Sequence, residues 1–292
     1  MKLLVSLNSK NLEDYLDYTN SFIIGLKNFS INYLELRIDE IKDLLHKYPD
    51  INLFVSINKN IFNDELPSLE NALLALSSLP ISGLFFYDLS LLSLCQKLNV
   101  SIPLVLNQTH MVTSYSNCNY YYDKGVSYAY LSSDITKDEI IEIKEHTKMK
   151  LMVLFMGYPA VSHSKRHLVS NYFKYKNIPD NKEYHTFKTK DSENYIIKED
   201  DKGTVILYGN ILNGAKYLEE LSDYIEYGIL DENLIDHALF IEVLSLYKEL
   251  LETKDKAILL KINTLIGEDT VFFDKKTFYK VKKNEKNWII VT

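Results

Sequence analysis

Short apolar runs alternate with amphipathic stretches along the first half of the chain, and this alternation constrains the fold more than any other feature. Each run has the length of a buried strand, and the stretches between them have helical spacing. This pattern is typical of βα units that build a parallel sheet. It predicts strands at residues 2–7, 22–26, 51–57, 83–87, 102–106, 126–131 and 150–155.

An eighth strand would close such a sheet into a barrel. With 292 residues, 46% of them hydrophobic, the chain is long enough for a single α/β barrel, which typically has roughly 250 residues. Residues 227–230 form a further apolar run, and apolar residues at helical spacing follow it. We therefore predict a TIM-like (β/α)8 barrel over residues 1–253.

Two other regions differ from the barrel pattern. Residues 177–202 contain five Lys against seven Asp and Glu and show no helical period, and a β-branched run follows at 204–208. We predict an inserted β-hairpin at 177–210 that packs over the barrel mouth. Residues 254–292 form a C-terminal extension with a basic and aromatic end, which indicates either a small β extension or a surface for single-stranded RNA.

Two helix starts can be predicted from capping residues. Thr136 and Glu139 have the spacing of a capping box in front of an apolar helical pattern. Ser68 precedes another such pattern, so we expect it to be the N-cap of that helix.

Composition restricts the function classes. The formal net charge of -7 argues against binding nucleic acid through overall charge. Cys95 and Cys118 are too few for a disulfide framework or a four-thiolate cluster, so we expect reduced thiols and no iron–sulfur cluster. We find no signal-peptide core and no apolar stretch long enough to cross a membrane, which predicts a cytoplasmic protein.

The segment at 150–173 is the best candidate for a functional site. Its apolar strand ends at Gly157 and Pro159, and polar and cationic side chains then follow closely. Ligands of parallel α/β proteins bind where strands end and loops begin. Arg166 and Lys165 stand out there, because no acidic residue lies between His163 and Lys176.

These two cations allow two interpretations. A guanidinium group at the barrel mouth would bind a carboxylate or phosphate. Alternatively, Arg166 pairs with Glu35 or Asp88 across the barrel and only holds the loop in place.

Histidines near strand ends are candidates for proton transfer or metal binding. His163 and His167 have the spacing of metal ligands on one helix face, but Ser164 stands where zinc helices carry Glu. We therefore predict no metal site. Asn107 and His110 directly follow a predicted strand, which makes His110 a candidate general acid or base, or else a histidine hydrogen-bonded within its loop.

Several motifs resemble those of the collagenase-like peptidase family U32. They are Gly157-Tyr158-Pro159, Ser164-Lys165-Arg166, Asn171-Tyr172-Phe173, residues 107–114 with Gly125-Val126, and the acidic segment with Gly-Thr at 198–205. Family members are named as peptidases, whereas relatives are implicated in hydroxylating the wobble uridine of tRNA. Many of those relatives hold an iron–sulfur cluster on four cysteines, one of them at the position of His167.

The resemblance implies a bacterial tRNA-hydroxylation protein that works with a larger, cluster-bearing paralogue. A collagenase-like peptidase, metal-assisted or not, and a non-catalytic binding subunit are the alternatives. The expected partners are a small carboxylate or peptide ligand, tRNA and the paralogue, with no membrane. We predict catalytic roles for His110, Arg166 and His163, and substrate contacts for Lys165, Ser164, Asn171, Tyr172, Asn107, Asp88 and Asp200.

Overall fold

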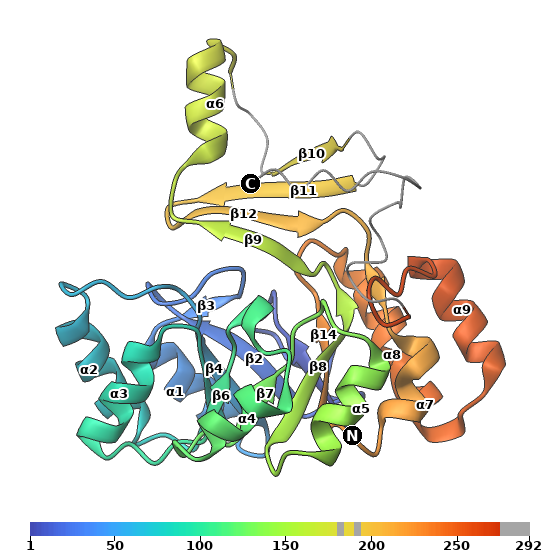
Figure 1. The fold of residues 1–292 in the computed structure, drawn as a ribbon, viewed down its shortest axis with the longest axis horizontal. Helices are drawn as coiled ribbons and strands as arrows, with labels where there is room; N and C mark the ends of the chain where they lie inside the picture. The colour runs from blue at the N-terminus through green and yellow to red at the C-terminus, as the bar shows by residue number, and fades with distance from the viewer. Residues whose placement is uncertain (180–183, 190–193, 275–292) are drawn as a thin grey trace, which may run out of the picture.

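The computed structural model describes residues 1–179, 184–189 and 194–274. Eight parallel strands form a closed barrel with helices around it (Figure 1), which confirms the predicted fold class. The barrel strands are β1 (Lys2–Ser6), β2 (Ser21–Leu26), β4 (Asn52–Ile57), β5 (Gly83–Phe86), β6 (Leu104–Leu106), β7 (Tyr128–Tyr130), β8 (Lys150–Gly157) and β14 (Tyr227–Asp231).

Closure of the barrel depends on its first strand. β1 pairs in parallel with β14, where Leu4 lies opposite Ile229, and also with β2, where Val5 lies opposite Phe22. The eighth strand predicted at 227–230 is therefore confirmed. Two short strands extend this sheet, β3 (Glu35–Leu36) beside β2 and β13 (Leu212–Asn213) beside β8.

Alternate side chains of the barrel strands point inward and fill the interior. The ring of Phe54 is packed edge-on, with its centroid 5.9 Å from that of Phe85 and 5.3 Å from that of Tyr227. Leu4 and Ile23 are completely buried in the same cluster. Because these side chains fill the barrel below the strand ends, a ligand would have to bind at the carboxyl-terminal mouth.

Helices cover the outside of the barrel. The Thr136 capping box is confirmed, since its hydroxyl accepts a hydrogen bond from the Glu139 backbone N–H and Glu139 bonds back to it. The prediction that Ser68 is an N-cap is wrong. The helix begins at Leu66, two residues before Ser68, and Pro67 lies in its first turn. The outer helices are α1 (Ile38–Lys47), α2 (Leu66–Leu76), α3 (Leu89–Leu98), α4 (Tyr115–Tyr122), α5 (Lys137–Glu145), α7 (Leu218–Leu221), α8 (His237–Thr253) and α9 (Lys256–Ile266).

A separate antiparallel sheet lies over the barrel mouth (Figure 1). The predicted hairpin corresponds to β11 (Asn194–Asp200) and β12 (Gly203–Tyr208), with β10 (Tyr184–Lys188) at one edge. The insertion also begins earlier than predicted, because β9 (Ala160–Ser164) pairs with β12. Helix α6 (Leu168–Lys176) follows β9 and stands away from the barrel.

The end of the described chain packs onto the barrel. Helix α9 contacts α8, and Phe272 and Phe273 are buried in the main core. The basic and aromatic residues at 275–292 lie outside the described residues, so both interpretations of the extension stay predictions. In the ranges that the structure describes, no helix is both long and apolar enough to cross a membrane.

Candidate functional site

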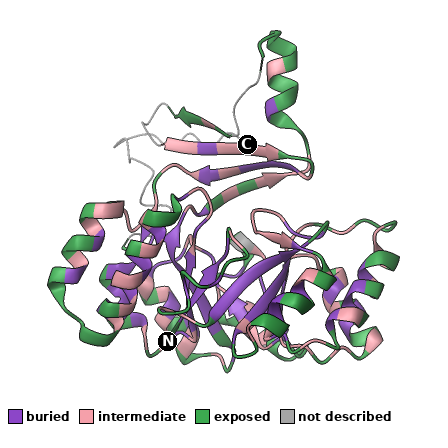
Figure 2. Cartoon of the chain, turned by 180° about the vertical axis from the view of Figure 1, so that it is seen from behind, coloured by how far each residue is buried: buried purple, intermediate pink, exposed green. Residues whose placement is uncertain are grey.

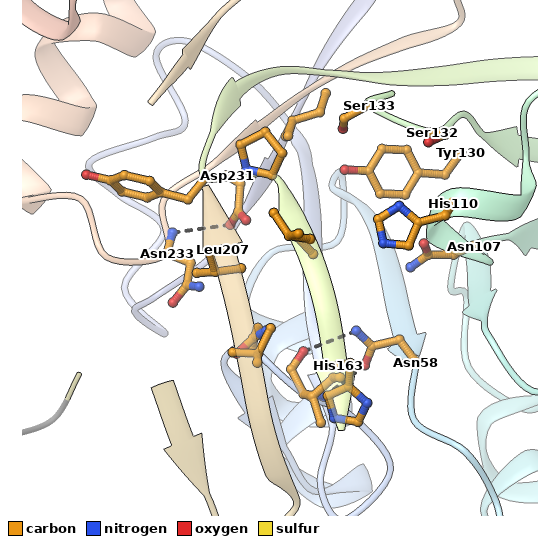
Figure 3. Close-up of a pocket in the computed structure, with 18 of the residues that line it drawn as sticks. Asn58, Asn107, His110, Tyr130, Ser132, Ser133, His163, Leu207, Asp231 and Asn233 are labelled. Carbon is orange, nitrogen blue, oxygen red and sulfur yellow. Dashed lines mark hydrogen bonds between the residues drawn. The ribbon is translucent and has the colours of Figure 1, made fainter. Parts of the chain in front are cut away.

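A cavity of about 300 Å³ lies at the carboxyl-terminal mouth of the barrel, beneath the inserted sheet. Its walls come from side chains at or just after the ends of six barrel strands, and its roof from β9 and β12. Figure 3 shows Asn58, Asn107, Tyr130, His163, Leu207 and Asp231 around this space. The strand-end residues are Asn58, Tyr87, Asn107, Tyr130, Tyr158 and Asp231, and the roof includes Ala160, Val161, His163, Val205 and Leu207.

Asp231, the last residue of β14, supplies a carboxyl group to the cavity. It continues the inward-facing series that begins with Tyr227 and Ile229. The Ser6 hydroxyl and the Asn233 backbone N–H, the latter at 3.2 Å, donate hydrogen bonds to it. Burial raises the pKa of Asp231 despite these two bonds, and the neighbouring charge of Glu232 acts in the same direction. The carboxyl group can therefore stay protonated at a higher pH than an exposed aspartate and donate a hydrogen bond.

Gly157 makes room for that carboxyl group. Its φ of +139° is a backbone conformation that L side chains rarely adopt, and an added Cβ would lie 2.7 Å from the Cβ of Asp231. The glycine that ends the predicted strand is thus required by close packing at the cavity as well as by the turn.

The residue after Asp231, Glu232, carries a second carboxylate. Glu232 is almost fully buried and accepts hydrogen bonds from the Tyr15 hydroxyl at 2.7 Å and from the His237 ring at 2.7 Å. Its backbone N–H donates to the Ser6 hydroxyl at 3.3 Å, so Ser6 connects the Asp231 carboxyl group to the backbone of Glu232. This network fixes the end of β14 in one position.

Two tyrosines face the cavity near Asp231. Burial raises the pKa of Tyr33 and of Tyr130 well above the ordinary value, and the charge of Asp231 adds to both shifts. Both hydroxyls therefore remain protonated near neutral pH and are available as hydrogen-bond donors.

His110 lies on the rim with Asn107, as predicted. Its Nδ1 is 2.7 Å from a carboxylate oxygen of Asp134, and the backbone of Val161 in the roof also raises the pKa of the imidazole. The bond with Asp134 raises the pKa of His110 although partial burial opposes the shift. The imidazole is thus oriented by a carboxylate and charged at a higher pH than a free histidine, which suits proton transfer.

His163 reaches the cavity from the roof. Partial burial and the nearby Lys165 lower its pKa, although Asp200 opposes the shift. His163 belongs to β9 and His167 precedes α6, so the two do not share a helix face. Among the described residues, no group of three metal-binding side chains is present.

Arg166 and its neighbours lie outside the cavity, in a stretch that we call the outer segment (residues 164–176). Arg166 is exposed. Lys165 donates a hydrogen bond to the Asn60 carbonyl at 3.0 Å and lies 3.2 Å from the centre of the Phe62 ring. The Ser164 hydroxyl accepts a bond from the Arg166 backbone at 3.2 Å.

Neither acid proposed as a partner of Arg166 pairs with it. Glu35 forms an ion pair with Lys202 at 2.6 Å. Asp88 is the N-cap of α3, accepts a hydrogen bond from the Ile61 backbone at 3.0 Å, and lies outside the cavity. The outer segment therefore offers an exposed cation at Arg166, whose role in catalysis stays a prediction.

The remaining candidates also lie away from the cavity. Asn171 and Tyr172 are exposed on α6, which buries only Val169. Asp200 is exposed and accepts a bond from the Lys202 backbone at 2.8 Å. The acid that faces inward is Glu199, which accepts hydrogen bonds from the backbone of Val169 at 2.7 Å and of Ser170 at 3.1 Å, and so holds the first turn of α6.

Sequence reasoning missed Asp231, Tyr33, Tyr130 and Asn233. The sequence does indicate Asp231 as a site residue, since it is the polar residue directly after the predicted strand 227–230. Tyr33 and Asn233 lie in loops without a strand-end pattern, so nothing local marked them.

The two cysteines do not fit an iron–sulfur cluster. Cys95 on α3 and Cys118 on α4 are both buried in the hydrophobic core. Burial raises the pKa of each thiol to about 11, which disfavours the thiolate that a metal requires.

The fold and the cavity define a (β/α)8 barrel protein with a polar site at the strand ends beneath an inserted sheet. A sequence model of peptidase family U32 matches residues 12–285. The chain belongs to this family.

Two relatives come from Bacillus subtilis strain 168. The tRNA hydroxylation protein P2 is 26% identical over 290 residues, which cover 89% of this chain and 92% of that protein. The tRNA hydroxylation protein P1 is 21% identical over 148 residues, which cover 51% of this chain and 35% of that protein. A solved structure from Aquifex aeolicus VF5 is 12% identical, with a TM-score of 0.44, and the match covers 91% of this chain and 90% of that one.

Proposed function

We propose that this protein takes part in tRNA hydroxylation, at C5 of the wobble uridine, and that the barrel-mouth cavity is its reaction site. The observation that carries the proposal is the similarity to tRNA hydroxylation protein P2, which extends over nearly the full length of both chains. Membership of family U32 supports it. A role in tRNA modification also implies a cytoplasmic location.

The cavity supplies groups suited to such a reaction. His110, oriented by Asp134, would hold or move a proton at the substrate. Asp231 and the Tyr130 hydroxyl would donate hydrogen bonds to an oxygen of the substrate or of a reaction intermediate. Arg166 and Lys165, outside the cavity, would contact RNA phosphates, consistent with their charge and with the exposure of Arg166.

A larger paralogue is the partner that we propose. The P1 and P2 relatives occur in the same organism, and the P1 match covers only about a third of that protein. Since this chain has two buried cysteines, we propose that any four-thiolate cluster belongs to the partner. Iron and sulfide analysis of the anaerobically purified chain tests this, and a bound cluster would contradict it.

Deleting the gene in its host and analysing tRNA nucleosides by mass spectrometry tests the function. We expect derivatives of 5-hydroxyuridine to disappear and to return when the chain is expressed again. Unchanged derivatives would contradict the proposal. If the purified chain instead hydrolysed gelatin, and Asp231→Asn abolished that hydrolysis, the peptidase alternative would be supported.

A further inference from the structure

We propose that the inserted sheet is a hinged lid over the barrel-mouth cavity, that Lys165 and Lys202 hold it closed, and that it opens to admit the substrate. This inference deepens the proposed function, on which it rests only in taking the cavity as the reaction site. A lid that closes over a substrate shields the reaction from water and completes the set of groups around it.

One end of the inserted sheet is joined to the barrel through the chain itself. β9 follows β8 after the turn at Gly157 and Pro159, and the chain returns from β12 to β13, where Leu212 pairs with Gly157. At this end the Tyr208 backbone N–H donates a hydrogen bond to the Pro159 carbonyl at 2.9 Å. The hinge of the proposed lid therefore lies at the end of β8.

The other end of the sheet reaches the opposite side of the barrel mouth. In the ring of eight strands, β8 is the seventh and β4 the third, so they face each other across the barrel. β9 runs from β8 toward the side of β3 (Figure 1), and Lys165 follows its last residue. Lys165 donates a hydrogen bond at 3.0 Å to the carbonyl of Asn60, in the loop after β4. An ammonium group has three donors, so this bond leaves Lys165 able to contact a phosphate as well.

An ion pair holds the same end of the sheet. Lys202, in the turn between β11 and β12, lies 2.6 Å from Glu35 on β3, and the two side chains are only 17% and 22% exposed. Gly203 has a φ of +129°, and an added Cβ would lie 2.2 Å from the Ser164 carbonyl oxygen. This close approach of β12 to β9 brings Lys202 and Lys165 to one edge of the mouth. Together their two contacts form a latch opposite the hinge.

Apolar packing between the sheet and the barrel is limited. The sheet has a small hydrophobic cluster of its own, formed by Ile196, Val205 and Leu207, which is separate from the two clusters of the barrel. Among the described residues, the partly buried hydrophobic side chains packed against it are Tyr158 and Leu234. Because few apolar contacts would be lost, the sheet can lift as a unit at much less cost than unfolding of the barrel.

Closure of the lid would complete the site beneath it. His163 on β9 lines the cavity, and the backbone of Val161 on the same strand acts on the imidazole of His110. Opening would withdraw both groups from the barrel rim. The cavity therefore has its full set of polar groups only while the lid is closed, and each turnover would include one opening and one closing.

Access of a bulky maleimide to the cavity tests the proposal in the full chain. Ser132→Cys introduces a thiol in the cavity wall, at a position that is only 4% exposed. Native Cys118 on α4 is completely buried and reports on unfolding of the whole protein. Mass spectrometry of peptides follows the labelling of each cysteine. We expect the introduced thiol to react on the order of a hundredfold more slowly than a free cysteine, because it reacts only when the lid opens.

Breaking the latch should speed this labelling. Lys202→Met should accelerate it about fivefold, as expected for loss of a partly buried ion pair. Glu35→Gln should have a similar effect, and combining the two should add little, since both remove the same contact. Lys97→Met is the matched control, because it breaks a 2.7 Å ion pair with Glu70 on the outer helices and should leave the rate unchanged.

A second reporter position guards against a local effect of the first. Leu207→Cys lies on the cavity side of β12, where the side chain is 2% exposed, and its labelling should respond to Lys202→Met in the same way. Thermal unfolding checks that each variant retains the fold.

The same labelling rate with and without Lys202→Met, or a free-cysteine rate at Ser132→Cys with the latch intact, would overturn the inference. Parallel acceleration at Cys118 would also overturn it, since the whole protein and not the lid would then be opening. The experiment contains no RNA, so its failure would leave the proposed function standing, and the deletion experiment tests that function separately.

Discussion

Residues 157–163 and the outer segment at 164–176 are consecutive in sequence but differ in their surroundings. The first part contacts the cavity, from the tightly packed Gly157 to the roof residue His163. The outer segment is largely exposed, which Figure 2 shows for α6 against the buried barrel strands. One short stretch thus builds both a closed polar site and an open cationic surface.

The difference between these two parts shows where the fold can accommodate charged side chains. In the outer segment, Arg166, Lys174 and Lys176 are exposed to water, whereas the described cavity lining has no Lys or Arg, because burial of an unpaired charge is expensive. The cavity instead contains the His110–Asp134 pair and groups whose neutral form is favoured by burial, such as Asp231 and Tyr130. Recognition inside must therefore depend on hydrogen-bond geometry, and recognition outside on charge.

The largest effect should follow from Gly157→Ala. The new Cβ would collide with Asp231 and occupy a disfavoured backbone conformation, so we expect the free energy of unfolding to fall by about 3 kcal/mol. Urea unfolding measures this. Gly125→Ala is the matched control, because φ there is +88° but no atom lies within 4 Å, and it should cost about 1 kcal/mol. Equal losses would show that close packing at the cavity is unimportant.

Glu199→Gln should loosen the outer segment without disturbing the cavity. Burial raises the pKa of Glu199, but hydrogen bonds from Ser170, Thr204 and Val169 outweigh it and leave the pKa lowered. The stabilisation is therefore present above the unfolded-state pKa and lost as pH falls. We expect the substitution to lower the free energy of unfolding by about 1–2 kcal/mol.

Hydrogen exchange locates that effect. The amides of Val169 and Ser170 should exchange faster in Glu199→Gln, while amides of β14 should not change. Asp200→Asn serves as the control, since this carboxylate is exposed. Faster exchange throughout the barrel would contradict the view that Glu199 stabilises α6 without affecting the barrel.

Asp231→Asn should change how stability depends on pH. Because the folded-state pKa is raised, the folded protein binds this proton more tightly than the unfolded chain does. The stability that the proton provides is complete below the unfolded-state pKa and is lost as pH rises through the folded-state value. Relative to wild type, the variant should therefore become more stable as pH rises above about 4. Denaturation at several pH values measures this, and an opposite slope would show a lowered pKa.

The smallest effect on stability should come from Arg166→Ala, because this side chain is exposed and neither Glu35 nor Asp88 pairs with it. We expect a change below about 0.5 kcal/mol in the free energy of unfolding. A substantially larger loss would show that Arg166 is a structural residue and not a surface cation.

The barrel was predictable because its signals are local. Apolar runs marked all eight strands, and the Thr136 capping box marked one helix start. The start at Ser68 was wrong because Pro67 can occupy the first helical turn, which moves the helix boundary upstream. β9 was missed because it is half-buried and polar, and its pairing with β12 joins residues about forty positions apart.

The site was predictable only in part. Asn107, His110 and His163 were found because polar residues near strand ends converge at a barrel mouth. The position of Arg166 was not, since it depends on β9 turning away into the inserted sheet. Nor could the closeness of Asp231 to Gly157 be predicted, because the two residues are 74 positions apart in the chain and only the pairing of β8 with β14 brings them together.

The most direct test compares two isosteric substitutions in cells whose tRNA hydroxylation depends on this chain. Asp231→Asn alters the cavity, and Asp200→Asn alters an exposed carboxylate of the inserted sheet. We predict that 5-hydroxyuridine derivatives, measured by mass spectrometry, fall at least about tenfold in the first variant and stay near the wild-type level in the second. Wild-type levels in Asp231→Asn, or equal losses in both variants, would contradict a reaction site at the barrel mouth.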